Sequence, residues 1–361
     1  MRNKILFLGI LAGSQILFTR VVTAQTEGDP NIVVVKDSAA ETETMAITAY
    51  NEGVKAFEGG RYTMAISFFD KTIKLKPTFE KAYFNRGKAR AESKLYKEAI
   101  ADYSKVLELT PGNDMATFSR GEAYLAMGNK DEALKDFNTA VLLNGEEPRY
   151  VYQRGVLKFE NTDYKSASND FTAALALNPK YAYALNDRGS CKRQMNDLDG
   201  AVTDYTAAIK ADPKLAFAYN NLGSALRLKG KYNESIVEYG NAIRLKADYF
   251  VAFNNRGSAK YENGDFDGAI KDFSEALKQN PKYAFALVNR AAAKHKLKDF
   301  KGCIDDCNKA IELDPTNGSA FLNRGIAYES LRDKSKACKD WDRASTLGLK
   351  NAKQYLNECS K

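Results

Sequence analysis

The sequence predicts an all-α protein, an α-solenoid in which nine similar helix-turn-helix units stack into a superhelix. Three observations predict it: a strict 34-residue period, a small and a large residue at fixed places in each period, and a proline that often closes it. The centres of the period are Gly53, Gly87, Gly121, Gly155, Gly189, Gly223, Gly257, Ala291 and Gly325. Because no insertion or deletion interrupts this register, the copies are expected to stack as structural repeats.

Each copy carries the signals that separate two helices. A small residue follows the centre by twelve positions and a large one by sixteen, as Ala201 and Tyr205 follow Gly189. The small residue lets two helices approach closely, and the large one fills the space between them. A later proline such as Pro213 cannot continue the second helix, and a glycine such as Gly230 suits a turn that needs positive φ.

This pattern resembles the tetratricopeptide repeat, and the resemblance covers about 306 of the 361 residues. It implies nine repeats, expected at 46–79, 80–113, 114–147, 148–181, 182–215, 216–249, 250–283, 284–317 and 318–351. Departures are local: Ala247 and Leu349 replace the closing proline, and Cys303 and Cys307 replace the small and large residues of repeat eight. A capping helix and tail, 352–361, is expected to cover the exposed end of repeat nine.

The N-terminal segment differs in kind from the repeats. Arg2 and Lys4 precede an apolar run of about fourteen residues, and small residues follow it, which is typical of a secretory signal peptide over residues 1–24. The run is short for a membrane span, which needs about twenty residues; retention as an anchor is the alternative. Residues 25–45 show no helical stripe and are predicted to be a flexible linker. We therefore expect an exported protein, periplasmic or secreted, that meets a membrane only if the signal segment is retained.

Charge and motifs argue against several classes of function. The formal net charge of +8 is modest, and lysines are interspersed with acidic residues, which is typical of solvated helix faces and does not favour a nucleic-acid partner. No glycine-rich phosphate loop, nucleophile elbow or paired zinc motif is present, and His295, the single histidine, has no carboxylate or cysteine at ligand spacing. The sequence predicts a non-enzymatic protein without a cofactor, a metal or a small-molecule substrate.

Five cysteines, an odd number in a chain expected to be exported, leave at least one thiol without an intramolecular partner. Cys338 and Cys359 form the most plausible bridge, which would join the last repeat to the capping helix; the sequence around them resembles the end of many exported bacterial repeat proteins. Two buried reduced thiols are the alternative. Cys303 and Cys307 occupy core positions of one helix and are interpreted as packing residues.

Seven repeats carry an arginine directly before the centre and an aspartate sixteen residues after that arginine. The pairs are Arg86 and Asp102, Arg120 and Asp136, Arg154 and Asp170, Arg188 and Asp204, Arg256 and Asp272, Arg290 and Asp306, and Arg324 and Asp340. Repeat one lacks both partners, with Glu52 and Phe68 in their places. Their joint absence predicts structural ion pairs within the stack, a role that suits the planar fork of arginine.

In tetratricopeptide repeats the first helices line a concave groove, so the candidate binding residues stand two residues before each centre, at position −2. These are Asn85, Ser119, Gln153, Asp187, Asn221, Asn255, Asn289 and Asn323. An amide offers both a donor and an acceptor, so a row of amides can pair with the backbone of an extended peptide. The series resembles the asparagine ladder in the repeat superhelix of O-linked N-acetylglucosamine transferases.

Repeats five to seven add polar residues three before the centre, at position −3, and one after it, at position +1. These are Asn186, Asn220 and Asn254, then Ser190, Ser224 and Ser258. Repeats one to four instead carry aromatics at position −3, namely Tyr50, Phe84, Phe118 and Tyr152. The pattern favours a two-part groove, aromatic and then amide-rich. The alternative is that the aromatics only pack on neighbouring helices and that asparagine recurs because the repeats are duplicated copies.

The function that this organisation predicts is a scaffold that holds an extended segment of a partner protein along its groove. The alternative is a structural assembly factor of an envelope complex, working through the convex face and the N-terminal tether. The two differ in which face of the solenoid meets the partner.

Overall fold

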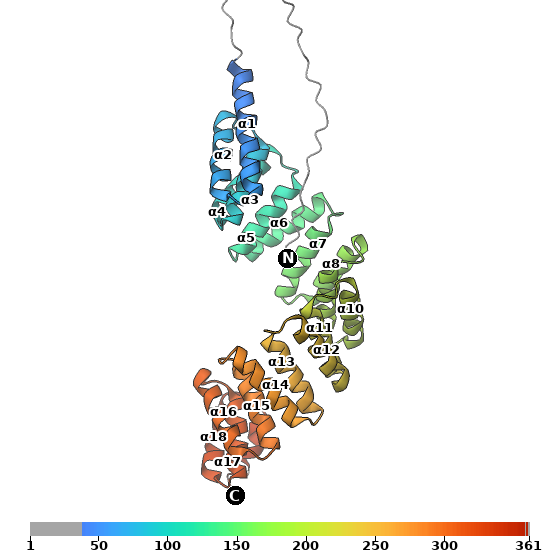
Figure 1. Ribbon diagram of the computed structural model, residues 1–361, viewed down its shortest axis with the longest axis vertical. Coiled ribbons are helices and arrows are strands. Elements are labelled where there is room, and N and C mark those ends of the chain that lie inside the picture. The colour runs from blue at the N-terminus through green and yellow to red at the C-terminus, as the bar shows by residue number, and fades with distance from the viewer. Residues whose placement is uncertain (1–37, 358, 360–361) are drawn as a thin grey trace, which may run out of the picture.

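The computed structural model describes residues 38–357 and 359, and within that part of the chain all regular structure is helical. Figure 1 shows the helices stacked one after another along an extended, curved molecule. They are α1 Ser38–Glu58, α2 Tyr62–Leu75, α3 Glu80–Glu92, α4 Tyr96–Leu109, α5 Asp114–Ala126, α6 Lys130–Leu143, α7 Pro148–Glu160, α8 Tyr164–Leu177, α9 Ala182–Gln194, α10 Leu198–Ala211, α11 Ala216–Leu228, α12 Tyr232–Leu245, α13 Phe250–Glu262, α14 Phe266–Gln279, α15 Ala284–Lys296, α16 Phe300–Leu313, α17 Gly318–Ser330, α18 Lys334–Thr346 and α19 Ala352–Leu356. The predicted all-α solenoid of paired helices is confirmed.

The prediction for the N-terminal linker is wrong in part. Helix α1 begins at Ser38, so residues 38–45 of the expected 25–45 linker are helical. Glu41 lies in the first turn, where the positive end of the helix dipole stabilises a negative charge. Glu43 pairs with Lys76, the residue that follows α2, at 2.7 Å and so links the extension to the first repeat. The predicted signal peptide, 1–24, and residues 25–37 lie outside the described residues.

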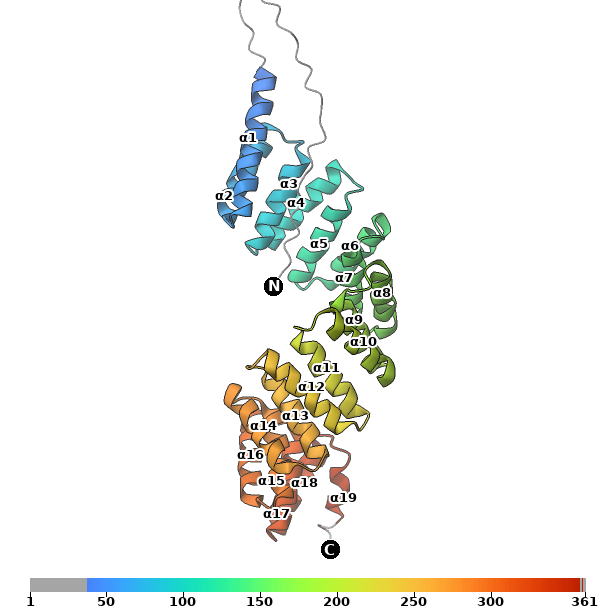
Figure 2. The ribbon, with the colours of Figure 1, turned by 45° about the vertical axis from the view of Figure 1, so that its right-hand side comes forward.

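The stack curves because its two kinds of helix pack differently. Each odd-numbered helix packs against its own second helix, and most odd-numbered helices also contact the next odd-numbered one, whereas the even-numbered helices show no comparable contact with each other. First helices of successive repeats therefore lie closer together than second helices do. The surface that α1, α3, α5 and the later first helices share is here called the inner face, because successive first helices contact each other. Figure 2 shows the curved stack from a second direction.

The centre glycines are required by this packing. A Cβ built at any of the eight would lie 2.5–2.9 Å from the large residue sixteen positions later, as at Gly189 against Tyr205. Real side chains essentially never approach that closely, so an alanine there would displace a buried ring. Repeat eight carries Ala291 in place of the glycine. The methyl group is tolerated there because the facing residue is the smaller Cys307, and both are fully buried.

The turn between the two helices has one conformation with several sequences. The four glycines that mark it, Gly60, Gly128, Gly230 and Gly264, have φ between 71° and 85°. In the other five repeats the same left-handed position is held by Lys94, Thr162, Asn196, Lys298 and Arg332, with φ of 62–64°. The backbone geometry is set by helix packing, and glycine only makes it less costly.

The C-terminal end is closed by a short helix and a disulfide. Helix α19 covers Ala352–Leu356, within the segment 352–361 where a capping helix and tail are expected, and its Tyr355 ring lies 5.1 Å from the ring of Trp341. The sulfurs of Cys338 and Cys359 are bonded at 2.03 Å, joining α18 to the residues after α19. Cys191, Cys303 and Cys307 are free and buried.

All seven predicted arginine–aspartate pairs form, with nitrogen–oxygen distances of 2.6–2.8 Å. The aspartates are 1–6% exposed. Burying a carboxylate is costly unless its charge and lone pairs are satisfied, and in each case the guanidinium donates to both carboxylate oxygens, as Arg256 does to Asp272 at 2.8 and 2.6 Å. The prediction of a structural role is confirmed by this geometry.

The same arginines also link neighbouring repeats, which the sequence did not reveal. The remaining guanidinium nitrogen reaches the second helix of the preceding repeat, as Arg290 reaches Ser274 at 3.0 Å and Arg324 reaches Asn308 at 2.7 Å. Two successive junctions lack this bond: Leu222 replaces the arginine of repeat six, and Gly240 offers Arg256 of repeat seven no side chain.

Candidate functional site

The residues at position −2 of repeats five to nine form a continuous row on the inner face, here called the amide row. Its members are Asp187, Asn221, Asn255, Asn289 and Asn323, one from each of α9, α11, α13, α15 and α17, and all are partly exposed. Neighbouring packed helices lie about 8–10 Å apart, a span that about three residues of extended chain cover. The row therefore presents polar groups at a spacing that suits an extended peptide.

Hydrogen bonds between repeats fix the orientation of these amides. Each row member reaches back to the position −3 residue of the preceding repeat: Asn221 donates to Asn186, Asn255 to Asn220 and Asn289 to Asn254, each at 3.0 Å. Asn323 meets no amide there and donates to the carbonyl of Val288 at 3.4 Å. A half-exposed amide held in one rotamer loses little entropy when it binds a ligand.

Four of the predicted site residues are buried beneath the amide row. Asn186, Asn220, Asn254 and Ser190 are only 4–9% exposed, so the expectation that they enlarge the contact surface is wrong. Their role is to hold the row, because buried polar groups need partners and here they find them in the next repeat. Ser224 and Ser258 remain partly exposed but donate to carbonyls four residues earlier in their own helices, at 3.0 and 3.1 Å.

Row amides keep hydrogen-bonding capacity for a ligand. An asparagine side chain has two N–H donors and two acceptor lone pairs. Asn221 uses one donor on Asn186 and accepts one long contact of 3.5 Å from Asn220; Asn255 is arranged in the same way. Within the described residues, one donor and one acceptor on each of these two side chains stay available, which is the pair that a peptide group requires.

Asp187 is the charged member of the row. Tyr152 donates to one of its oxygens at 2.7 Å and Asn186 to the other at 2.9 Å. Burial raises the pKa of this carboxyl, because desolvation penalises the charged form more than the two hydrogen bonds favour it. Asp187 thus marks the junction where the aromatic repeats meet the amide-rich ones.

The aromatics at position −3 of repeats one to four pack against neighbouring rings, and Phe118 is buried in the core. Phe118 is 2% exposed and lies 5.3 Å from Phe137 and 4.4 Å from Tyr150, measured between ring centroids. Tyr50 contacts Phe69 and Phe79 in the same way, and its hydroxyl accepts from Asn85 at 2.8 Å. The alternative interpretation of these aromatics as packing residues is the one that the contacts favour.

A second feature of the inner face was missed from the sequence. One helical turn before position −2, at position −6, stand large apolar residues with substantial exposure: Ile47 at 44%, Met115 at 42%, Tyr183 at 46% and Phe285 at 69%. Tyr183 also lies 5.6 Å from Phe217 of the next repeat, ring to ring. Residues four apart share a helix face, so this spacing was the signal that could have identified them.

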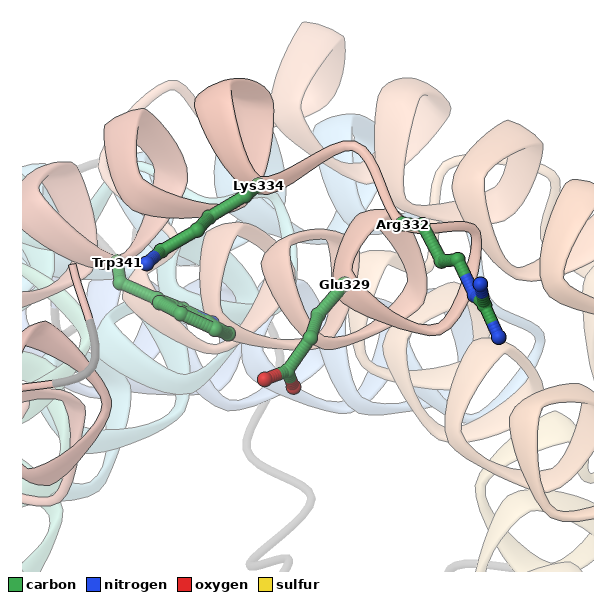
Figure 3. Close-up of a pocket in the computed structure, with 4 residues that line it drawn as sticks. All are labelled: Glu329, Arg332, Lys334 and Trp341. Atoms are coloured by element: carbon green, nitrogen blue, oxygen red, sulfur yellow. The ribbon is translucent and has the colours of Figure 1, made fainter. Parts of the chain in front are cut away.

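Other features of the described residues offer no comparable site. A depression of about 350 Å³ lies beside repeat nine and is lined by Glu329, Arg332, Lys334 and Trp341. Figure 3 shows Lys334 extending to the Trp341 ring and Arg332 pointing away from it. The depression includes no residue of the amide row. No cluster of histidine, cysteine and acidic residues in this part of the chain could hold a metal ion, and none of its helices is both long and apolar enough to cross a bilayer.

Comparison with known proteins decides the family. Models described as tetratricopeptide repeats match residues 80–113 and 118–147, and overlapping matches run from 152 to 339. The chain belongs to the tetratricopeptide repeat family. No curated protein matches it significantly.

Solved structures show the same repeat fold. A tetratricopeptide repeat protein from Parabacteroides merdae ATCC 43184 is 18% identical, with a TM-score of 0.54 over 69% of this chain and 99% of that one. Cut9 of the APC/C hetero-tetramer Cut9–Hcn1 is 15% identical, with a TM-score of 0.57 over 88% and 76%. YrrB, described as a TPR protein with an unusual peptide-binding site, is 24% identical, with a TM-score of 0.45 over 51% and 95%. The first two of these likenesses show the fold alone.

Proposed function

We propose that this tetratricopeptide repeat protein is a non-enzymatic scaffold that binds an extended segment of a partner protein along its inner face. The observation that carries the proposal is the amide row, whose side chains are oriented by bonds between repeats and keep a free donor and acceptor at Asn221 and Asn255. Main-chain pairing gives affinity with little demand on sequence, as in other modes of extended-peptide recognition. Binding is therefore expected to be broad, with side-chain pockets adding selectivity.

A stability-matched pair of variants tests the proposal. Asn255→Ala removes a row amide, and Asn144→Ala removes a similar part-buried amide that follows the second helix α6 and bonds Asp114 at 2.9 Å. Each should lower the free energy of unfolding by roughly 1 kcal/mol, because each leaves a partner without its hydrogen bond. Peptides selected from a displayed library of random 12-residue sequences should bind Asn255→Ala at least about fivefold more weakly than wild type and bind Asn144→Ala unchanged.

Two results would count against this function. Equal losses of binding in both variants would mean that affinity follows stability and not the row. Failure of the wild-type chain to select any peptide would remove the scaffold proposal in this form.

We also propose that the protein is exported. Support comes from the basic and apolar pattern of residues 1–24 and from the Cys338–Cys359 bond, since disulfides persist in oxidising compartments. Expression in a Gram-negative host followed by mass analysis of the extracytoplasmic fraction should yield a chain starting at Gln25. A full-length chain found only in the cytoplasm would contradict export.

A further inference from the structure

Two arginines occupy the same place on neighbouring first helices. Arg193 on α9 and Arg227 on α11 both stand four residues after their centres, at position +4. On α9 the residues Asn186, Ser190 and Arg193 are spaced by four and three, so they share one face of the helix. In each repeat a buried tyrosine hydroxyl lies beside the serine of that face, Tyr205 at 3.1 Å from Ser190 and Tyr239 at 3.0 Å from Ser224.

The two arginines differ in their partners. Arg227 forms a salt bridge with Glu262, thirty-five residues later on the next first helix. The residue thirty-five after Arg193 is Leu228, which is 53% exposed and offers no charge. Arg193 thus has the same surroundings as Arg227 without the carboxylate.

Other acidic groups near Arg193 are already engaged. Glu160, at the end of the preceding first helix, pairs with Lys130 at 2.9 Å. Asp187, on the same helix as Arg193, accepts from Tyr152 and Asn186. Among the described residues no carboxylate pairs with Arg193, and its Nε is buried without a hydrogen-bond acceptor. A guanidinium nitrogen in that state is costly to leave unpaired.

We propose that Arg193 receives the side-chain carboxylate of an aspartate or glutamate in the extended segment that lies on the amide row. This inference rests on the proposed function and names the chemistry of its partner. A guanidinium and a carboxylate can form two parallel charge-assisted hydrogen bonds, which are about twice as strong as neutral ones. The carboxylate of the segment takes the place beside Arg193 that the Glu262 carboxylate takes beside Arg227.

The carboxylate belongs to a side chain and not to the C-terminus of the segment. Arg193 follows Asp187 by six residues, which is about 9 Å along the helix axis at 1.5 Å per residue. A peptide backbone on the amide row therefore passes to one side of Arg193, and only a side chain reaches across. A terminal carboxylate would lie on the row itself, where Asp187 repels it.

The opposite side of the row favours an apolar neighbour for the acidic residue. Tyr183 and Phe217 lie near the other ends of α9 and α11, 5.6 Å apart between rings. Successive side chains of an extended chain point to opposite sides. The segment is thus expected to carry an acidic residue directly beside a large apolar one.

Selection of peptides on the wild-type chain should enrich this pair of residues. In a selected peptide, replacing the acidic residue by its amide should weaken binding to wild type about tenfold, which is the effect of losing one charged hydrogen-bonded pair. The same replacement should change binding to Arg193→Gln less than about twofold.

Two further variants separate pairing from general charge effects. Leu228→Glu places a carboxylate where Glu262 stands relative to Arg227, so it should occupy Arg193 and abolish the preference for acidic peptides. Glu262→Gln is the matched change one repeat later; it should leave the preference at Arg193 intact and create a second acidic preference at Arg227.

Outcomes that overturn this inference differ from those that overturn the function. Peptides that depend on Asn255 but show no acidic preference, or that bind only through a free C-terminal carboxylate, would remove the role of Arg193 and leave the amide row as the binding site. A preference that persists in Arg193→Gln would also remove it. Absence of any selected peptide would remove the proposed function itself.

Discussion

Repeats one to four and repeats five to seven solve the same packing problem with different chemistry at position −3. In the first group an aromatic ring fills the space between helices, as Phe118 does against Phe137 and Tyr150. In the second group an asparagine is buried there and bonds the next repeat, as Asn220 accepts from Asn255. Position −3 can serve both the core of its own repeat and the link to the next one, since Phe118 also stacks on Tyr150 of repeat four and the Tyr50 hydroxyl accepts from Asn85 of repeat two.

The difference coincides with a gap in the arginine links. The junctions into repeats six and seven lack the arginine bond to the preceding second helix, since Leu222 and Gly240 interrupt it. At these two junctions the amide pairs Asn221 with Asn186 and Asn255 with Asn220 connect the repeats. The comparison teaches that the amide row, the proposed binding surface, is also a part of the stack, so its variants need stability controls.

The largest expected effect tests the aromatic side of the comparison. Phe118→Ala should lower the free energy of unfolding by about 3–5 kcal/mol, because it removes a buried ring and leaves a cavity beside Phe137 and Tyr150. Urea denaturation followed by circular dichroism measures it. A loss below about 1 kcal/mol would mean that this ring is not a core residue and that the two halves differ less than their contacts indicate.

A smaller effect is expected where the halves meet. Burial raises the pKa of Asp187 in the folded chain, so the folded chain binds this proton more tightly than the unfolded chain does. The free energy of unfolding therefore falls as pH rises from the ordinary aspartate pKa through the raised one. Asp187→Asn cannot titrate. The unfolding free energy of wild type relative to this variant should therefore be lower at pH 7 than at pH 4.

Comparing the same two proteins at both pH values cancels any constant cost of the substitution. An identical difference at pH 4 and pH 7 would show that Asp187 is as hydrated in the folded chain as in the unfolded one.

The smallest expected effect concerns the arginine link that is missing between Gly240 and Arg256. Gly240→Ser should stabilise the chain by about 1 kcal/mol, from helix propensity and from a new acceptor for Arg256, because a Cβ at Gly240 meets only that guanidinium, at 3.8 Å. Gly240→Ala is the control; it gains about 0.5 kcal/mol more helix propensity than serine does and offers no acceptor. A smaller thermal shift for Gly240→Ser than for Gly240→Ala would show that the serine forms no link of the kind that Ser274 gives Arg290.

The sequence by itself determined the repeats, the paired helices and the seven ion pairs, because a fixed period imposes the same neighbours on each copy. It also placed Asn221 and Asn255 on the inner face. It could not decide that Asn186 and Asn220 lie beneath that face, since positions −2 and −3 are adjacent in sequence and only the distance between successive first helices determines which is covered. The sequence likewise did not show that the first helix begins at Ser38, or that Glu43 in this extension pairs with Lys76, thirty-three residues later.

Partners across repeats were decided only by tertiary structure. Arg193 and Arg227 are equivalent in the repeat register, and what separates them is the residue that the curvature of the stack brings alongside, Leu228 in one case and Glu262 in the other. Periodicity fixes which residues are equivalent. Curvature fixes which of them meet, because the separation of neighbouring helices sets the reach of every side chain between repeats.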